Sequence, residues 1–491
     1  MRFKTLLLAI SGLTLAVNTI SGQTDPLSQE VVERVRQVEN SLGTRFYTDS
    51  SQHNSIQAQM FKYRLNGLSI AVINNFEVEW AKAYGVTDQV DKTPVTTETV
   101  FQAASMSKTV NAIAILKLKE NTQLNLDAEV NTLLNSWQLP YNLKITDQKI
   151  TLRQLLSHTG GLSTHGFNGY RNTSHLPGII ETLEGQKPAN SDKVRPVMVP
   201  GKEFRYSGGG TTLSQLILTD TQNDSYEQFI EKELFQPLGL KNAFYSIQLD
   251  KYARKEMAYA HLKSGKPIKN KFNYYPESAA AGLWITPTDL ASILIDLQLS
   301  LKGKPAMILS QASAIEMISP PIENDISGLG VFIEQMKEET YLQHAGSNRG
   351  FRGKFMIGST NGKGVVIMVN GPQTQIIEEI LQSVANVYKW PGFEPINTAE
   401  ISFTKADIEA YTGTFQFQKR TVSVSYKNDT FVMTERGKWT SQLIPLSHKS
   451  FILKDVKPQA TVDFMVDKDG KVTQLITQQG ASVTWTKASD K

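Results

Sequence analysis

Ser105 and Lys108, in the segment Ser-Met-Ser-Lys, are the first residues in this chain whose types and spacing could do chemistry. Residues 105–119 are mostly good helix formers, so they predict a helix on which positions three apart share one face. A serine hydroxyl becomes a nucleophile when a base takes its proton, and a lysine amine is such a base once burial or another cation lowers its pKa. The free N–H groups at a helix start also favour developing negative charge. We therefore expect Ser105 to be a nucleophile and Lys108 to activate it.

This spacing alone is weak evidence, because Ser402 and Lys405 repeat it beside an expected linker, where no apolar helix begins. Tyr206 adds independent support, because it lies in a glycine-dense segment just before a helix expected over 211–221. A phenol placed near a lysine can carry a proton between reacting groups. Tyr206 is therefore a third candidate catalytic residue.

The segment His344-Ala345-Gly346-Ser347 supplies the last group of candidates. It precedes a run expected to be a strand over 351–358, and its small residues would let a substrate lie beside the backbone. A backbone N–H there could complete an oxyanion hole with the N–H of Ser105. Loss of one such donor typically costs roughly 2.7–4 kcal/mol of transition-state stabilisation.

In this order, the three motifs resemble the signature of the penicillin-recognising serine hydrolases. The version here is most similar to the class C β-lactamase branch (penicillin-binding protein and β-lactamase-related, peptidase S12-like), which includes esterases, D-stereospecific aminopeptidases and carboxypeptidases. The resemblance extends over roughly residues 30–390. Flanking segments that share it are residues 67–72, 83–85, 101–104, 155–162 and 280–290.

The resemblance implies a role for each candidate. Ser105 would be the nucleophile, Lys108 its activating partner, and Tyr206 the group that exchanges protons with the leaving group. The backbone N–H of Ser347, next to Gly346, would join that of Ser105 in the oxyanion hole. His344 stands where true β-lactamases commonly carry a lysine. Neither a cofactor nor a metal is implied.

Two departures from the family pattern bear on the substrate. Gly208 stands where many relatives carry an asparagine whose amide contacts substrate and lysine. His344 is less surely cationic than a lysine, since an unperturbed imidazole has a pKa of about 6.5. Both changes favour an esterase or D-amino acid peptidase over efficient penicillin hydrolysis. The alternative is a non-catalytic or very slow penicillin- or peptidoglycan-binding sensor module.

Other polar and aromatic residues receive simpler interpretations. His158 is expected to support a helix end and the loop after it, and His165 is expected to be solvated in a loop. Trp284 is expected in the core. Arg349 and Arg352 would either bind a substrate carboxylate or pair with surface acids. The seven histidines form no His-Glu-x-x-His pair, so no metal site is expected.

The order of expected elements predicts the fold. Strands at 68–74 and 78–84, helices through the middle, and late strands with a helix at 373–388 predict an α/β (α+β) fold. This would be an antiparallel sheet flanked by helices, with an inserted helical subdomain. Residues 409–491 alternate short strands with hairpin signals, which predicts a small all-β barrel similar to the lipocalin-like domains of some such hydrolases.

Composition and termini set the remaining expectations. Residues 1–22 have the layout of a signal peptide, followed by a hydrolase domain at 23–390, a linker at 391–408 and the barrel domain at 409–491. The protein is therefore expected to be periplasmic or secreted, with no membrane contact beyond the signal segment. A net charge of +4 is too small to indicate a nucleic-acid-binding protein. The absence of cysteine excludes disulfides and thiolate catalysis. The expected partner is a small-molecule or peptide substrate, and the oligomeric state is left open.

Overall fold

The computed structural model describes residues 27–488, except 49–52, 142–146, 246–255, 323–325, 436, 455, 457–459 and 480. The signal peptide expected at 1–22 lies outside the described residues. In the part of the chain described, no helix is long and apolar enough to cross a bilayer.

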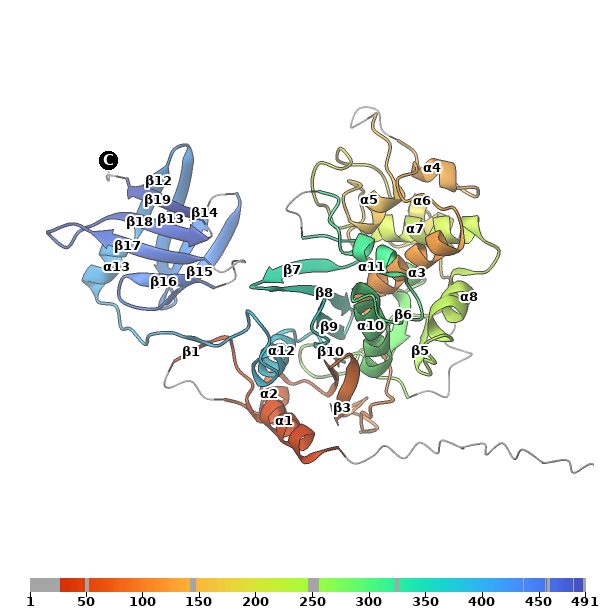
Figure 1. Cartoon of the computed structure of the whole chain (residues 1–491), viewed down its shortest axis with the longest axis horizontal. Coiled ribbons are helices and arrows are strands. Elements are labelled where there is room, and N and C mark those ends of the chain that lie inside the picture. The colour runs from red at the N-terminus through yellow and green to blue at the C-terminus, as the bar shows by residue number, and fades with distance from the viewer. Residues whose placement is uncertain are drawn as a thin grey trace, which may run out of the picture.

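A six-stranded antiparallel sheet forms the centre of the larger part of the molecule (Figure 1). Two of its strands come from early in the chain and four from after residue 330, as the order of expected strands predicted. The strand order across the sheet is β3 (Glu77–Gly85), β2 (Gly67–Asn74), β10 (Gly364–Val369), β9 (Phe351–Gly358), β8 (Glu339–Asn348) and β7 (Phe332–Met336).

Both faces of the sheet are covered, because successive side chains of a strand point to opposite sides. In β2, Ala71 and Ile73 join the core on one face, while Ile70 and Val72 join the core on the other. The first face packs against the helical layer that contains α3 (Ser107–Asn121) and α10 (Pro287–Leu301). The second face is covered by α1 (Gln29–Asn40), α2 (Ile56–Tyr63) and α12 (Gln375–Val387).

The inserted helical layer lies between the early and late strands, as expected. It also contains a small sheet in the order β4 (Phe101–Gln102), β6 (Leu283–Ile285) and β5 (Ala243–Tyr245). Its other described helices include α4 (Val130–Leu133), α5 (Leu152–Leu156), α6 (Ile179–Glu184), α7 (Gly208–Thr221), α8 (Tyr226–Ile230) with its π-helical continuation Glu231–Phe235, the π-helix Ser278–Gly282, and α11 (Gln311–Met317).

The expected start of the helix over 211–221 was wrong. Helix α7 begins at Gly208 rather than residue 211, because the Ser207 side chain caps it by accepting from the Gly210 N–H. Helix α10 is capped by Thr286, with Pro287 in its first turn. The segment 344–347 precedes the strand expected over 351–358, which is β9, and itself lies within β8. Its glycine and polar residues interrupt the apolar alternation that marks a strand.

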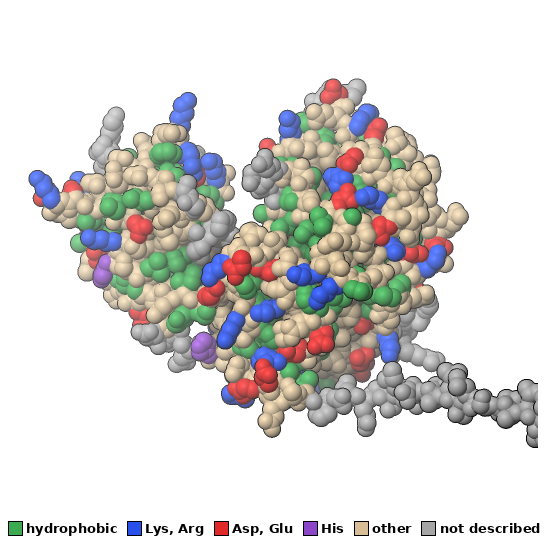
Figure 2. All heavy atoms as spheres, viewed as in Figure 1, with side chains coloured by type: hydrophobic (Ala, Val, Ile, Leu, Met, Phe, Trp, Pro, Cys, Tyr) green, Lys and Arg blue, Asp and Glu red, His purple; other side chains and the backbone are tan. Residues whose placement is uncertain are grey.

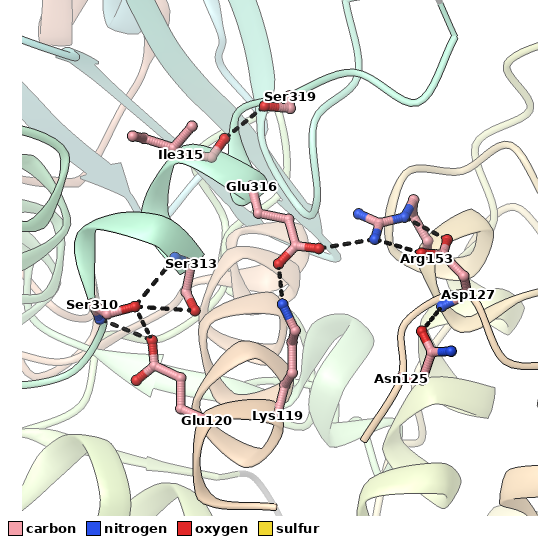
Figure 3. Close-up of polar contacts among 10 residues, drawn as sticks. All are labelled: Lys119, Glu120, Asn125, Asp127, Arg153, Ser310, Ser313, Ile315, Glu316 and Ser319. Carbon is pink, nitrogen blue, oxygen red and sulfur yellow. Dashed lines mark hydrogen bonds and ion pairs between the residues drawn. The ribbon is translucent and has the colours of Figure 1, made fainter. Parts of the chain in front are cut away.

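An ion-pair network fixes the far end of α3, the helix that carries Lys108 (Figure 3). Glu316 of α11 accepts from Lys119 of α3 and from Arg153 of α5, the latter at 2.8 Å. Arg153 also pairs with Asp127 at 2.7 Å. The network links three helices of the inserted layer, so α3 is held at its end as well as along its buried length.

The carboxy-terminal part is a closed eight-stranded antiparallel barrel, which confirms the all-β barrel predicted from the sequence. Its strands follow one another in chain order, and β12 pairs with β19 to close it. An aromatic core fills the barrel, including Phe415, Phe451 and Phe464. The strands are β12 (Gly413–Phe417), β13 (Arg420–Lys427), β14 (Thr430–Glu435), β15 (Trp439–Pro445), β16 (Ser450–Leu453), β17 (Thr461–Val466), β18 (Val472–Gln479) and β19 (Ala481–Lys487).

The segment between sheet and barrel has structure of its own. Strand β11 (Ile396–Asn397) pairs in parallel with β1 (Phe46–Tyr47), and Phe403 packs against the barrel core. Helix α13 (Lys405–Tyr411) is capped by Thr404, so Ser402 lies before the helix that Lys405 begins. Ser402 and Lys405 therefore do not share a helix face.

Charges of both signs are interspersed on the face of the molecule drawn in Figure 2. Charged side chains of the described residues also form ion pairs, as Lys354 does with Glu378 and Lys337 with Glu394. This surface agrees with the small net charge of the chain.

The core position of Trp284 generates a stability prediction. Its side chain is fully buried and its ring lies 4.9 Å from that of Phe272 and 5.5 Å from that of Phe351. Trp284→Ala is expected to lower the free energy of unfolding by about 3–5 kcal/mol in urea denaturation, because it leaves a large cavity. Phe61→Ala, at a side chain 88% exposed, should change it by less than about 0.5 kcal/mol. Equal losses in the two variants would contradict this interpretation.

Candidate active site

Ser105 and Lys108 are in contact, as their spacing predicted. Ser105 lies in a short 3₁₀ turn, Ala104–Met106, that runs directly into α3. The Lys108 Nζ donates to the Ser105 Oγ at 3.2 Å and to the Ala280 carbonyl oxygen at 2.7 Å. Lys108 is only 3% exposed, so its amine is enclosed by protein and directed at the serine.

The turn that carries Ser105 is strained and firmly held. Ala104 has a φ of 50°, in the left-handed region, where a non-glycine residue typically costs roughly 1–3 kcal/mol. The Ser107 Oγ donates to the Ala104 carbonyl at 2.5 Å and accepts from the Leu283 N–H at 3.2 Å. The Ala103 N–H donates to the Leu283 carbonyl at 2.9 Å. These bonds fix the turn to β6.

Strand β8 passes immediately beside this turn at Gly346. A Cβ added to Gly346 would lie 2.2 Å from the Ala103 carbonyl oxygen, so only glycine allows this approach. Strand β7 pairs with β8 only as far as Gln343, so residues 345–348 extend beyond the end of β7. The backbone of β8 next to Ser105 therefore lies at the edge of the sheet.

Asn348 is a site-positioning residue that sequence reasoning missed. Its Nδ2 donates to the Gln102 Oε1 at 2.8 Å and to the Ala281 carbonyl at 3.1 Å. The side chain thereby ties the end of β8 to the strand that leads into the nucleophile turn. No local pattern could have identified it, because its partners are distant in the chain.

Tyr206 lies among the other candidates. Its ring centroid is 5.1 Å from the Lys108 Nζ, 4.3 Å from the ring centroid of His158 and 6.2 Å from that of His344. The side chain is half-buried. Residues far apart in sequence thus converge on the serine and lysine.

His158 does support the chain after a helix end, and it also holds the Tyr206 segment in place. Its buried Nδ1 accepts from the Ser207 N–H at 3.2 Å. Burial lowers the pKa of His158 well below its ordinary value, and the nearby positive charge of Lys108 has a smaller effect in the same direction. The imidazole is therefore neutral and works as a hydrogen-bond acceptor.

His344 is also neutral. Burial lowers its pKa to about 3, and the charge of Lys108 contributes in the same direction. Its Nδ1 lies 2.8 Å from the Ala345 carbonyl oxygen, so Nδ1 carries the ring proton and Nε2 is left as an acceptor. Nε2 is buried and has no hydrogen-bond partner among the described residues. This residue cannot hold a substrate carboxylate by charge at neutral pH.

One cavity of about 1360 Å³ joins these groups. It is lined by Ser105, Tyr206, His344, Gly346 and Ser347, while Lys108 lies behind Ser105. Its size exceeds the roughly 300–1,000 Å³ of a typical small-molecule pocket. The cavity can therefore admit a substrate larger than a single amino acid derivative.

Arg352 also lines this cavity, whereas Arg349 is exposed and does not. The Arg352 Nη1 donates to the carbonyl oxygens of Asn348 at 2.8 Å and Phe351 at 2.7 Å. Within the described residues, neither arginine forms an ion pair with an acid. Those residues also contain no group of three His, Asp or Glu placed to hold a metal.

The neutral state of His344 can be tested through the pH dependence of stability. The unfolded chain takes up a proton on this ring as the pH falls below 6.5, and the folded chain does so only near pH 3. Stability from this residue is complete above pH 6.5 and is lost as the pH falls, by up to about 1.4 kcal/mol per pH unit. In urea denaturation, His344→Gln should reduce the slope of unfolding free energy against pH between about pH 4 and 6. An unchanged slope would mean that the folded protein binds this proton.

Comparison with known proteins agrees with this geometry. Residues 53–386 match the Beta-lactamase family. Protein flp of Staphylococcus aureus (strain N315) is 24% identical over 340 residues, which cover 67% of this chain and about 64% of the length of that protein. An octameric penicillin-binding protein homologue from Pyrococcus abyssi has a TM-score of 0.60 at 20% identity, covering 88% of this chain and 98% of that one. D-amino acid amidase from Ochrobactrum anthropi SV3 has a TM-score of 0.54 at 17% identity, and the match covers 73% of this chain and 99% of that one. The family match spans more than half of the chain, and with the shared fold it confirms that this protein belongs to the Beta-lactamase family of serine hydrolases.

Proposed function

We propose that this protein is an exported serine hydrolase that cleaves amide or ester bonds through an acyl-enzyme on Ser105. The observation that carries the proposal is the buried Lys108 Nζ at 3.2 Å from the Ser105 Oγ, in a cavity lined by Tyr206 and the free edge of β8. The signal-like residues 1–22 support export to the periplasm or beyond.

The acylation step follows from this arrangement. The Ser105 Oγ attacks the substrate carbonyl carbon while its proton passes to the Lys108 amine, which the Ala280 carbonyl holds in place. The backbone N–H groups of Ser105 and Ser347 would stabilise the oxyanion of the tetrahedral intermediate. That intermediate collapses as the bond to the leaving group breaks, and Tyr206 delivers a proton to the departing amine or alcohol.

Deacylation repeats the step with water as the nucleophile. Water attacks the acyl carbon while the lysine–tyrosine pair takes a proton from it. The bond to the Ser105 Oγ then breaks, and the pair returns that proton to the serine. The acid product then leaves. No metal or cofactor is needed for either step.

The first test is covalent labelling of Ser105. A fluorophosphonate probe or a fluorescent penicillin should label the wild-type protein and fail to label Ser105→Ala. Ser402→Ala is a matched control, because it removes the serine of the same spacing that does not share a helix face with its lysine. Labelling is therefore expected to survive in this control. Equal labelling of the wild type and Ser105→Ala would refute the proposal that Ser105 is the nucleophile.

A sensor module is the second candidate, favoured by Gly208 and by the neutral His344. It predicts ligand binding without turnover. A panel of nitrocefin, a short-chain p-nitrophenyl ester and D-alanyl peptides separates the two functions. Turnover that disappears in Ser105→Ala would exclude the sensor.

The charge pattern of the cavity bears on substrate choice. Since His344 is neutral, a substrate carboxylate needs another cation, and we propose Arg352 for that role. Lys354 lines the same cavity but is already paired with Glu378 at 2.8 Å. Arg352 is opposite Ser347 in the β8–β9 register, so the two side chains lie on the same face of the sheet.

The role of Arg352 can be tested with a D-alanyl-D-alanine peptide and the same peptide ending in a carboxamide. Arg352→Gln should lower kcat/KM for the free acid about 10- to 100-fold, the expected loss for a charge-assisted hydrogen bond. For the carboxamide it should stay within about twofold, because that substrate has no negative charge to lose. Arg349→Gln, at the exposed arginine outside the cavity, should change neither. Equal losses for acid and carboxamide in Arg352→Gln would contradict a carboxylate contact.

A further inference from the structure

The loop of residues 163–168 is bound tightly to the beginning of α7. The Ser207 Oγ donates to the Ser163 carbonyl at 2.7 Å, the Gly209 N–H donates to the Thr164 carbonyl at 3.0 Å, and the Gly208 N–H donates to the His165 carbonyl at 3.0 Å. Residues 207–209 thus donate one hydrogen bond each to the backbone carbonyls of residues 163–165. The position of this loop is therefore well defined.

Glycine at position 208 is what allows the loop to approach. A Cβ at Gly208 would lie 3.1 Å from the His165 carbonyl oxygen and 3.1 Å from a ring carbon of Phe167. Both distances are shorter than most contacts that Cβ atoms make in proteins. The His165 carbonyl is also held in place, because it accepts a hydrogen bond from the Gly208 N–H. The loop occupies the space that a side chain at position 208 would need, including the asparagine that similar hydrolases carry there.

The same loop brings His165 to the cavity. Its ring centroid lies 4.9 Å from that of Tyr206, and the residue lines the cavity with Ser105. The side chain is exposed, as the sequence suggested, but it faces the candidate active site. The described residues offer its ring no hydrogen bond, in contrast to His158 and His344. Its two nitrogens are thus available to a ligand.

We propose that His165 determines substrate specificity by binding an amide group of the substrate beside Tyr206, in place of the side chain that Gly208 lacks. A neutral imidazole presents one donor and one acceptor, so it can either accept from an amide N–H or donate to an amide C=O. The inference rests on the proposed function, since it requires that the substrate binds at Ser105. It favours acylated amino acid derivatives over simple alkyl esters.

Two matched p-nitrophenyl esters test this role in the full-length protein. One carries an N-acetyl-D-alanyl group, and the other is a butyrate that lacks the amide. His165→Phe keeps an aromatic ring against Tyr206 but removes the hydrogen bond, whereas His165→Gln keeps hydrogen-bonding groups. His175→Phe, at an exposed histidine elsewhere in the same region, is the control.

His165→Phe should raise KM about three- to tenfold for the N-acetyl-D-alanyl ester, the range expected for one neutral hydrogen bond. The KM for the butyrate should stay within about twofold of the wild-type value. For the N-acetyl-D-alanyl ester, the increase in log KM in His165→Gln should be at most half of the increase in His165→Phe. His175→Phe should match the wild type with both esters. Equal changes for both esters, no change for either, or no recovery by glutamine would overturn the inference. Butyrate turnover that persists in Ser105→Ala would instead refute the proposed nucleophile.

Discussion

The close approach of the β8 backbone to the Ala103 carbonyl is the contact on which the site depends. Gly346 and Ala103 are far apart in the chain, and a single added methyl group would lie 2.2 Å from the carbonyl oxygen. The contact places the free edge of the sheet beside the strained turn that carries Ser105. The ties from Asn348 to Gln102 and Ala281 preserve this spacing.

Burial then decides the electrostatics around that contact. Lys108, His158 and His344 are all enclosed, and the two imidazoles are neutral because a buried charge near Lys108 would be costly. Lys108 is the basic group in contact with the nucleophile, and Arg352 is an arginine that lines the same cavity.

Two glycines allow close approaches between segments around the cavity. Gly346 lets a strand approach the nucleophile, whereas Gly208 lets a loop approach Tyr206 and excludes a side chain from position 208. The first approach brings the edge of the sheet to Ser105, and the second accompanies the placement of His165 against the cavity beside Tyr206. A departure from the family motif at one position is thus connected to a loop about forty residues earlier in the chain.

The sequence by itself determined the family, the α/β fold with its carboxy-terminal barrel, and the contact between Ser105 and Lys108, because helix periodicity and strand alternation are local properties. It also singled out Tyr206 and His344, through their order along the chain. Only the tertiary structure decided that His344 is neutral, that Asn348 ties β8 to the nucleophile turn, and that His165 faces the cavity. Burial, backbone approach and loop position arise from segments that meet only after folding, so no local pattern in the sequence contains them.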